Sequence, residues 1–222
     1  MSDATISQKA SRRWPVISAT VAILLAAALG AILALRPDEP LAVDLEWMEE
    51  MLDERNAVIE ALALVMNYLG GGIIGVVIVP AVVIVAFLIA RRPWAALYFT
   101  LSIIASAGLV QLLKQLVGRA RPEEILVVAD YGSFPSGHTA NAATMAVVFG
   151  LVFGRLWIWA AGFLYTAMMA FSRTYLGAHW LSDTIGGILI GAGVAVIIWA
   201  PFADRLERER EQHRRNGIAG AA

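Results

Sequence analysis

Long uncharged stretches alternate with short charged ones along the 222 residues of this chain. A helix needs about 20 apolar residues to cross the hydrocarbon core of a bilayer, because each residue advances it by about 1.5 Å. Four stretches meet this requirement: 15–35, 61–90, 93–113 and 184–203. Two shorter stretches, 139–154 and 156–172, are separated by Arg155 alone and predict two helices in a tight hairpin. The pattern therefore predicts an all-α, polytopic membrane protein with six transmembrane helices.

The first apolar stretch has a second interpretation. Arg12 and Arg13 stand directly before it, as basic residues do before the core of a secretory signal peptide. Its apolar part is longer than the usual core of about 7–15 residues, and five further apolar stretches follow it. We therefore expect a retained transmembrane anchor.

The composition agrees with a protein whose solvent is largely lipid. Apolar residues make up 59% of the chain, charged residues 16%, and the mean hydropathy is +0.69. A soluble domain is about half apolar and about a quarter charged, which argues against a soluble enzyme. The 17 basic and 18 acidic residues give a net charge of −1, so nothing indicates nucleic-acid binding. The absence of cysteine excludes disulfides and thiolate metal sites.

Basic residues in short loops predict the orientation, because they remain on the cytoplasmic side. With six spans, one side of the membrane receives four groups of basic residues: those before the first helix, Arg91 with Arg92, Arg155, and the arginines of the tail. The loop at 36–66, with nine acidic and two basic residues, falls on the other. We therefore expect a plasma (inner) membrane protein with cytoplasmic ends at 1–14 and 204–222. No linker divides the chain, so one domain is expected over 1–222.

Three segments outside the main spans carry further expectations. In the acidic outer loop, Leu45, Met48 and Leu52 approximate one apolar stripe, which predicts a helix over 41–60. This helix is either an interfacial helix or lid, or a solvated connector, which explains the charges equally well. The mixed Glu and Arg residues of 204–215 predict an exposed helical extension. The triple glycine at 70–72 predicts a close helix contact or a local break.

Ionisable residues beside membrane helices are costly, so each one needs a reason. A group of them maps to two outer loops and the adjoining helix ends: Lys114, Arg121, His138, Arg173, His179 and Asp183. The three cations outnumber what structural pairing with the neighbouring carboxylates requires, and a surplus of positive charge suits an anion. Arginine and lysine both bind phosphate oxygens well. Ser136 and Gly137 precede the fourth helix, whose free N–H groups suit phosphate, with Ser136 as N-cap.

The two histidines suit different tasks. His179 and Asp183 are four residues apart, so they share one face if this turn is helical. A carboxylate in that position holds the ring tautomer and stabilises the imidazolium. His179 is therefore the better nucleophile, attacking phosphorus to form a phosphohistidine. His138 would protonate the leaving group and then activate water. This chemistry requires no metal and no cofactor.

Together the segments resemble the type 2 phosphatidic acid phosphatase superfamily of membrane lipid phosphatases. The family pattern is Lys, six residues, Arg-Pro; then Pro-Ser-Gly-His; then Ser-Arg, five residues, His, three residues, Asp. All eleven specified positions are filled in order and at the right spacing. The resemblance implies a nucleophile at His179, an acid/base at His138 and an orienting carboxylate at Asp183. It implies phosphate binding by Lys114, Arg121, Ser136, Gly137 and Arg173.

Other residues near these motifs have simpler interpretations. Arg119 fits none of the three motifs and is interpreted as a headgroup or surface charge. Trp180 and Tyr175 are expected to anchor the chain at the membrane interface, where aromatic residues are enriched. Asp183 alone would also suit a helix cap, and a single histidine at a helix end often has no catalytic task.

The resemblance implies hydrolysis of a lipid phosphate or diphosphate at the outer interface, with the lipid tail remaining in the bilayer. Similarity to short bacterial members favours undecaprenyl diphosphate, with phosphatidylglycerol phosphate or phosphatidic acid as the alternative. Two other classes remain. Vanadate-dependent haloperoxidases share the pattern of cations and histidine but are soluble proteins. A non-catalytic lipid-binding or transport protein is disfavoured because no motif residue is missing.

Overall fold

The computed structural model describes residues 3–36 and 39–219, with side chains for 13–36 and 39–215. The ends of the predicted cytoplasmic segments, part of the acidic loop at 37–38, and the side chains of Lys9 and Arg12 lie outside this part. The described chain is all-helical and contains no strand, as the sequence predicts. Its elements are α1 (Asp3–Ala34), α2 (Ala42–Asp53), α3 (Ala57–Gly70), η1 (Ile74–Ile78), α4 (Val79–Ile89), α5 (Pro93–Val117), α6 (Gly137–Phe153), α7 (Leu156–Tyr175) and α8 (Leu181–Ala219).

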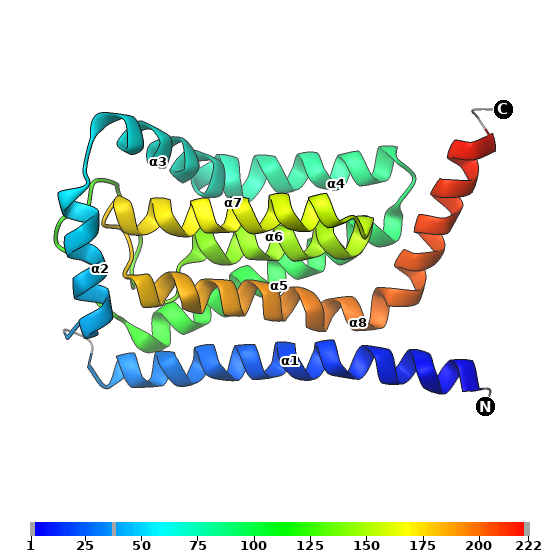
Figure 1. Cartoon of the computed structure of the whole chain (residues 1–222), viewed down its shortest axis with the longest axis horizontal. Coiled ribbons are helices and arrows are strands. Elements are labelled where there is room, and N and C mark those ends of the chain that lie inside the picture. The colour runs from blue at the N-terminus through cyan, green and yellow to red at the C-terminus, as the bar shows by residue number, and fades with distance from the viewer. Residues whose placement is uncertain (1–2, 37–38, 220–222) are drawn as a thin grey trace.

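The long helices run side by side, and α2 lies across one end of the bundle (Figure 1). The helix α6 packs against α7 and α8, and α1 covers α8. At the end covered by α2, α5 ends, α6 begins, α7 ends and α8 begins; α1 begins and α8 ends at the opposite end. The helix ends that carry the three motifs therefore meet at one end of the bundle.

The described helices include several that are suited to a membrane. Three are long and apolar enough to cross it, over Arg13–Ala34, Pro93–Val117 and Leu181–Arg215, and a fourth span results if α3 and η1–α4 are taken as one bent segment. The helix α6 is apolar but shorter. Large apolar side chains such as Leu24, Val82 and Phe163 point outward from the bundle. Because an exposed apolar surface of this extent is unfavourable in water, the chain is an integral membrane protein.

The apolar stretch 61–90 is not one straight helix. The helix α3 ends at Gly70, and the chain bends by 46° before η1 and α4 continue. Gly72 has a φ of +56°, which glycine adopts without a steric penalty. The local break predicted from the three glycines is therefore confirmed. It places the α3–η1 bend beside the start of α6.

The helix α2 and the tail differ from the expected pattern. The buried face of α2 carries Asp44, Met48 and Met51, whereas Leu45 is half exposed, so the predicted stripe is out of phase. The tail continues α8 beyond the predicted span to Ala219, past a bend visible in Figure 1 and with Pro201 inside the helix. The tail is predicted to be exposed, and this prediction is wrong for Glu209, whose side chain is buried.

The tail is docked on the bundle by polar contacts. Glu209 is buried, and its two carboxylate oxygens accept the N–H groups of Trp94 at 2.7 Å and Ala95 at 3.1 Å. These N–H groups belong to the first turn of α5, where they have no partner within the helix. Glu209 therefore caps α5, and the negative charge suits the positive end of that helix dipole.

Candidate active site

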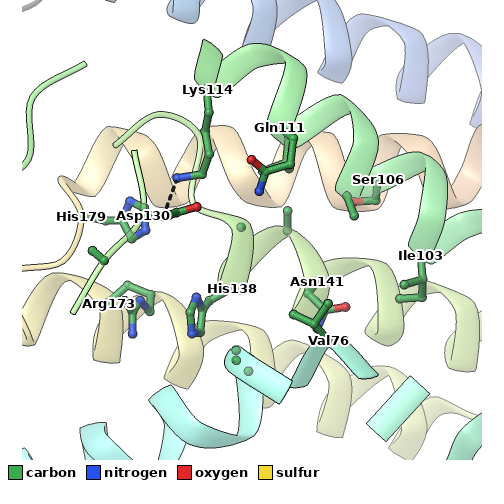
Figure 2. Close-up of a pocket in the computed structure, with 18 of the residues that line it drawn as sticks. Val76, Ile103, Ser106, Gln111, Lys114, Asp130, His138, Asn141, Arg173 and His179 are labelled. Carbon is green, nitrogen blue, oxygen red and sulfur yellow. Dashed lines mark hydrogen bonds and ion pairs between the residues drawn. The ribbon is translucent and has the colours of Figure 1, made fainter. Parts of the chain in front are cut away.

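Six of the eight predicted site residues line one cavity of about 360 Å³ at the end of the bundle beneath α2: Lys114, Arg121, Gly137, His138, Arg173 and His179. Figure 2 shows the charged side chains and both histidines gathered at one end of this cavity, with Val76, Ile103 and Ser106 at the other. The cavity is therefore polar and cationic at one end and largely apolar at the other. Ser136 and Asp183 do not line it.

Two of the three cations of this site are held by the loop between α5 and α6. The Lys114 Nζ donates to the Gly132 carbonyl at 2.6 Å and lies 3.3 Å from Asp130 Oδ1. The Arg121 guanidinium donates to the same carboxylate oxygen at 2.7 Å and to the Gly132 carbonyl at 2.9 Å. One exposed carboxylate thus bridges two cations in the position that an anionic ligand would favour (Figure 2).

The charge of Asp130 is stabilised by this contact. Burial alone would raise the pKa of Asp130, but Lys114 and Arg121 outweigh it, and the pKa lies below its usual range. The carboxylate is therefore ionised at neutral pH and offsets one of the positive charges. A ligand that carries two or more negative charges can compete with it for the same donors.

His179 stands between this cationic end and a buried carboxylate. Its Nε2 lies 3.4 Å from Arg121 Nη1, and its Nδ1 lies 3.5 Å from Asp183 Oδ2. The latter distance is long for a hydrogen bond, as is common for catalytic contacts without a substrate. Both side chains are buried. His179 lies in the turn before α8, which begins at Leu181, so the helical turn assumed from the spacing does not include it. The ring and the carboxylate nevertheless face each other, and Nε2 is on the side of the Arg121 guanidinium.

Burial controls the protonation of His179. It lowers the pKa of the ring from 6.5 to about 4, against the opposing effect of Asp183. The ring is therefore neutral at pH 7, and Nε2 can carry a free electron pair if Nδ1 holds the proton toward Asp183. A neutral imidazole is the form that a nucleophile requires.

His138 and Arg173 are joined by a residue that the sequence analysis missed. Asn67 of α3 accepts a hydrogen bond from Arg173 Nη1 through its side-chain oxygen, and its backbone carbonyl lies 3.2 Å from His138 Nε2. Asn67 belongs to none of the three motifs and lies 106 residues before Arg173. Its one signal in the sequence is that it is a polar residue inside the apolar stretch 61–90. The tertiary fold alone brings it to the site.

The α3–η1 bend lies against the ring of His138. A Cβ placed on Gly71 would overlap with the imidazole, and one on Gly70 would meet Met169 as well. Gly71 has a φ of −142°, an extended conformation that other residues adopt readily. The requirement for glycine at this position is therefore the space for the His138 ring, not the backbone conformation.

The start of α6 departs from the prediction in one respect. Ser136 is the N-cap residue of α6, but its side chain makes no capping hydrogen bond. Its Oγ instead accepts from Thr139 Oγ1 at 3.1 Å, and its N–H donates to the Asp183 carbonyl at 3.0 Å. Gly137 lies at the cavity wall. The predicted N-cap contact of Ser136 is therefore wrong, and phosphate binding by Ser136 stays a prediction.

Three interpretations of neighbouring residues are also wrong. Arg119 is no surface charge: its side chain is 1% exposed and forms ion pairs with Asp44 and Asp183, both at 2.6 Å. Tyr175 and Trp180 are buried and not interface anchors. The Tyr175 hydroxyl accepts the Asn56 N–H at 2.7 Å, and the Trp180 indole donates to the Ala120 carbonyl at 2.9 Å. These side chains support the walls of the site from behind.

Within the described residues, no group of three or more His, Asp or Glu side chains is placed to hold a metal ion. The cavity brings three cationic side chains together with two histidines, a set suited to phosphate. The sequence of residues 95–207 matches the model of the PAP2 superfamily. The chain belongs to the PAP2 superfamily.

Individual PAP2 proteins resemble this chain over part of its length. A lipid A 1-phosphatase of Rhizobium johnstonii is 31% identical over 125 residues, which are 50% of this chain and 49% of that protein. A putative undecaprenyl-diphosphatase of Escherichia coli, YbjG, is 40% identical over 77 residues, 33% of this chain and 38% of that one. The chain thus spans about half the length, or less, of these curated relatives.

A solved structure extends the similarity to the fold. The crystal structure of Aquifex aeolicus LpxE matches with a TM-score of 0.65 and 29% sequence identity, over 72% of this chain and 97% of that one. The crystal structure of a transmembrane PAP2 type phosphatidylglycerolphosphate phosphatase from Bacillus subtilis has the same fold, with a TM-score of 0.69 and 21% identity over 82% of this chain and 96% of that one. The helical bundle described above is therefore a fold of this superfamily. The matched family segment begins at residue 95, so α2 and α3, with Asp44 and Asn67, lie outside it.

Proposed function

We propose that this PAP2 protein hydrolyses a phosphate or diphosphate ester of a lipid through a phosphohistidine on His179. One observation carries the proposal: a neutral, buried histidine has Asp183 on one side and faces a cavity lined by three cationic side chains and a second histidine. Each of these groups has a task in phosphoryl transfer, and no simpler structural role requires all of them in one cavity.

The first half of the reaction forms the phosphoenzyme. The substrate phosphate replaces the Asp130 carboxylate on Lys114 and Arg121, and Arg173 binds a further oxygen. The His179 Nε2 attacks phosphorus, and the bond from phosphorus to the leaving oxygen breaks as His138 protonates that oxygen. The cations stabilise the charge that builds up on the transferring group, which supplies the largest share of the acceleration in reactions of this kind.

The second half of the reaction releases phosphate. His138, now unprotonated, takes a proton from a water molecule, and the resulting hydroxide attacks the phosphorus of the phosphohistidine. The N–P bond breaks, and Asp183 stabilises the charge that the His179 ring carries while it is phosphorylated. The ring is then free for another cycle, and His138 holds the proton for the next leaving group.

The shape of the cavity supports a lipid substrate. Its far end, where Val76 and Ile103 lie with Ser106, is largely apolar and adjoins helices that face the bilayer (Figure 2). A lipid can thus place its headgroup among the cations while its tail stays in the hydrocarbon region. We propose undecaprenyl diphosphate first, because Gln111 and Asn141 line the cavity beyond the cations and offer polar groups to a second phosphate (Figure 2). Lipid A 1-phosphate is the second candidate, favoured by the similarity to the Rhizobium protein.

Phosphate release by detergent-purified protein tests this proposal. The substrates are undecaprenyl diphosphate, lipid A 1-phosphate, phosphatidylglycerol phosphate, phosphatidic acid and a soluble aryl phosphate. We expect the highest kcat/KM with undecaprenyl diphosphate, since its second phosphate can contact Gln111 and Asn141 while the first lies among the cations. Faster turnover of lipid A 1-phosphate or of the glycerolipids would contradict undecaprenyl diphosphate as the preferred substrate but would leave the proposed mechanism unchanged. Absence of turnover on all five would contradict the phosphatase itself.

We further propose six spans in one domain, with both termini in the cytoplasm and the site facing the periplasm or the cell exterior. The helices α6 and α7 supply the two spans beyond the four candidates, and basic residues cluster at the end of the bundle opposite the site.

Cysteine labelling tests this topology. The chain has no cysteine, so one introduced thiol reports a single position. Val128, fully exposed in the loop beside the site, should react as Val128→Cys with an impermeant reagent on intact cells. The control Arg155→Cys should react only after permeabilisation, and the reverse pattern would invert the topology.

A further inference from the structure

A buried ion-pair relay connects α2 to the carboxylate that faces His179. The Arg119 guanidinium lies between two carboxylates, with Nη2 at 2.6 Å from Asp44 Oδ2 and Nη1 at 2.6 Å from Asp183 Oδ1. The side chains of all three residues are at most 1% exposed. Charges buried so completely persist only when they are paired and hydrogen-bonded, so each member depends on the others.

Both oxygens of Asp44 are used in this relay. In addition to the contact with Arg119, Asp44 accepts the Ser182 N–H at 2.8 Å and the Ser182 hydroxyl at 2.7 Å. Ser182 directly precedes Asp183 in the first turn of α8. Asp44 therefore fixes both the guanidinium and the backbone beside the orienting carboxylate.

The two oxygens of Asp183 are divided between the relay and the active site. Oδ1 accepts from Arg119, while Oδ2 accepts the Trp180 N–H at 2.9 Å and the Ser133 hydroxyl and faces the His179 ring. Arg119 thus fixes the rotation of the carboxylate about its own axis. Without Asp44, Asp183 would be the only carboxylate paired with Arg119 in this relay. The negative charge of Asp183 would then be more fully neutralised and would stabilise a positively charged His179 ring less.

We propose that Asp44 is a positioning residue of the active site, acting through Arg119 to hold Asp183 in the orientation that His179 requires. This proposal rests on the proposed function of His179 as nucleophile. Asp44 lies in the acidic segment that precedes the matched family region, which covers residues 95–207. The proposal therefore gives a functional role to a residue outside that region. Through Asp44, the helix α2 then supports the active site and is not a solvated connector.

The variant Asp44→Asn tests the proposal, because it keeps the volume and removes the charge. We expect kcat on a soluble aryl phosphate to fall by roughly 10- to 100-fold, the range seen when a partner that orients an active group is removed. The KM should stay unchanged, because no substrate-binding cation is touched. The variant Asp44→Glu, which restores the charge, should recover part of the rate. All kinetics are measured on the monodisperse fraction from size-exclusion chromatography.

The matched control is Glu46→Gln, which removes one negative charge from an exposed position of the same helix. It should retain the wild-type kcat. Wild-type kcat in folded Asp44→Asn, or a raised KM with unchanged kcat, would overturn the proposal while leaving the phosphatase intact. If Asp44→Asn does not fold, Ser182→Ala decides, since loss of its hydroxyl loosens the same relay: an unchanged kcat there also overturns it. Inactivity of the wild-type chain on every substrate would instead contradict the proposed function, and this proposal with it.

Discussion

Replacing His179 by alanine is expected to lower phosphate release by roughly 10⁶-fold, the loss found when another enzyme is deprived of its nucleophile. His138, the other histidine that lines the cavity, contacts the Asn67 backbone carbonyl, whereas His179 has the Asp183 carboxylate beside its ring, so His179 is the better placed nucleophile. Rates are measured with the soluble aryl phosphate and with undecaprenyl diphosphate. The lowered pKa of about 4 keeps the wild-type ring neutral, so protonation of His179 should reduce the rate only near that pH and not between pH 6 and 8.

Two controls separate loss of the nucleophile from loss of the fold. The third histidine, His213, lies exposed in the tail at the opposite end of the bundle, and His213→Ala should keep the wild-type rate. Acid-labile phosphate should be trapped on the wild-type chain and not on His179→Ala. Substantial activity of His179→Ala, or phosphate trapped on another residue, would contradict the assignment of His179 as the nucleophile.

Replacing His138 by alanine is expected to lower the rate by roughly 10²- to 10⁴-fold, the usual contribution of a general acid or base. The two half-reactions should respond differently. An aryl phosphate has a good leaving group and needs little protonation, so His179 should still be phosphorylated in the variant. Water then lacks its base, and the phosphohistidine should accumulate. Rapid-quench trapping of the acid-labile phosphate measures this. If the variant forms no phosphoenzyme at all, the two histidines have the opposite roles.

A companion variant displaces the ring of His138 without removing it. Gly71→Ala places a methyl group against the imidazole at a backbone conformation that alanine tolerates. A misplacement of about 1 Å can cost roughly 10²-fold in rate, so the expected loss lies at the lower end of the range for His138→Ala. Gly108→Ala is the matched control, because a Cβ there meets nothing within 4 Å. Equal rates for the two alanine variants would show that the α3–η1 bend does not constrain the catalytic ring.

Local chemistry explains why the sequence pointed to much of this site. Only three residues stand between His179 and Asp183, and the turn that leads into α8 at Leu181 keeps the two side chains close together. The three cations and two histidines lie beside predicted membrane helices, where ionisable groups are costly, and this marks them in the sequence. The three successive glycines at 70–72 also indicate the break between α3 and η1, because glycine adopts backbone conformations that end a helix. Such features depend on neighbours in the chain, and the sequence contains them directly.

The remaining residues of the site acquire their roles from distant partners. Arg119 is indistinguishable in the sequence from the surface arginines, and its burial follows from Asp44, 75 residues away. Asn67 likewise reaches Arg173 across 106 residues. Glu209 resembles the exposed acidic residues around it until the tail folds back on α5.

By itself, the sequence determined the all-helical membrane architecture, the three motifs and the pairing of His179 with Asp183. Periodicity and local spacing are properties of one chain segment and can be read without the fold. Only the tertiary structure decided which charges are buried, which helix end is capped and which residues outside the motifs complete the site. The energy of a buried charge depends on the partner that meets it, and that partner is chosen by the packing of whole helices.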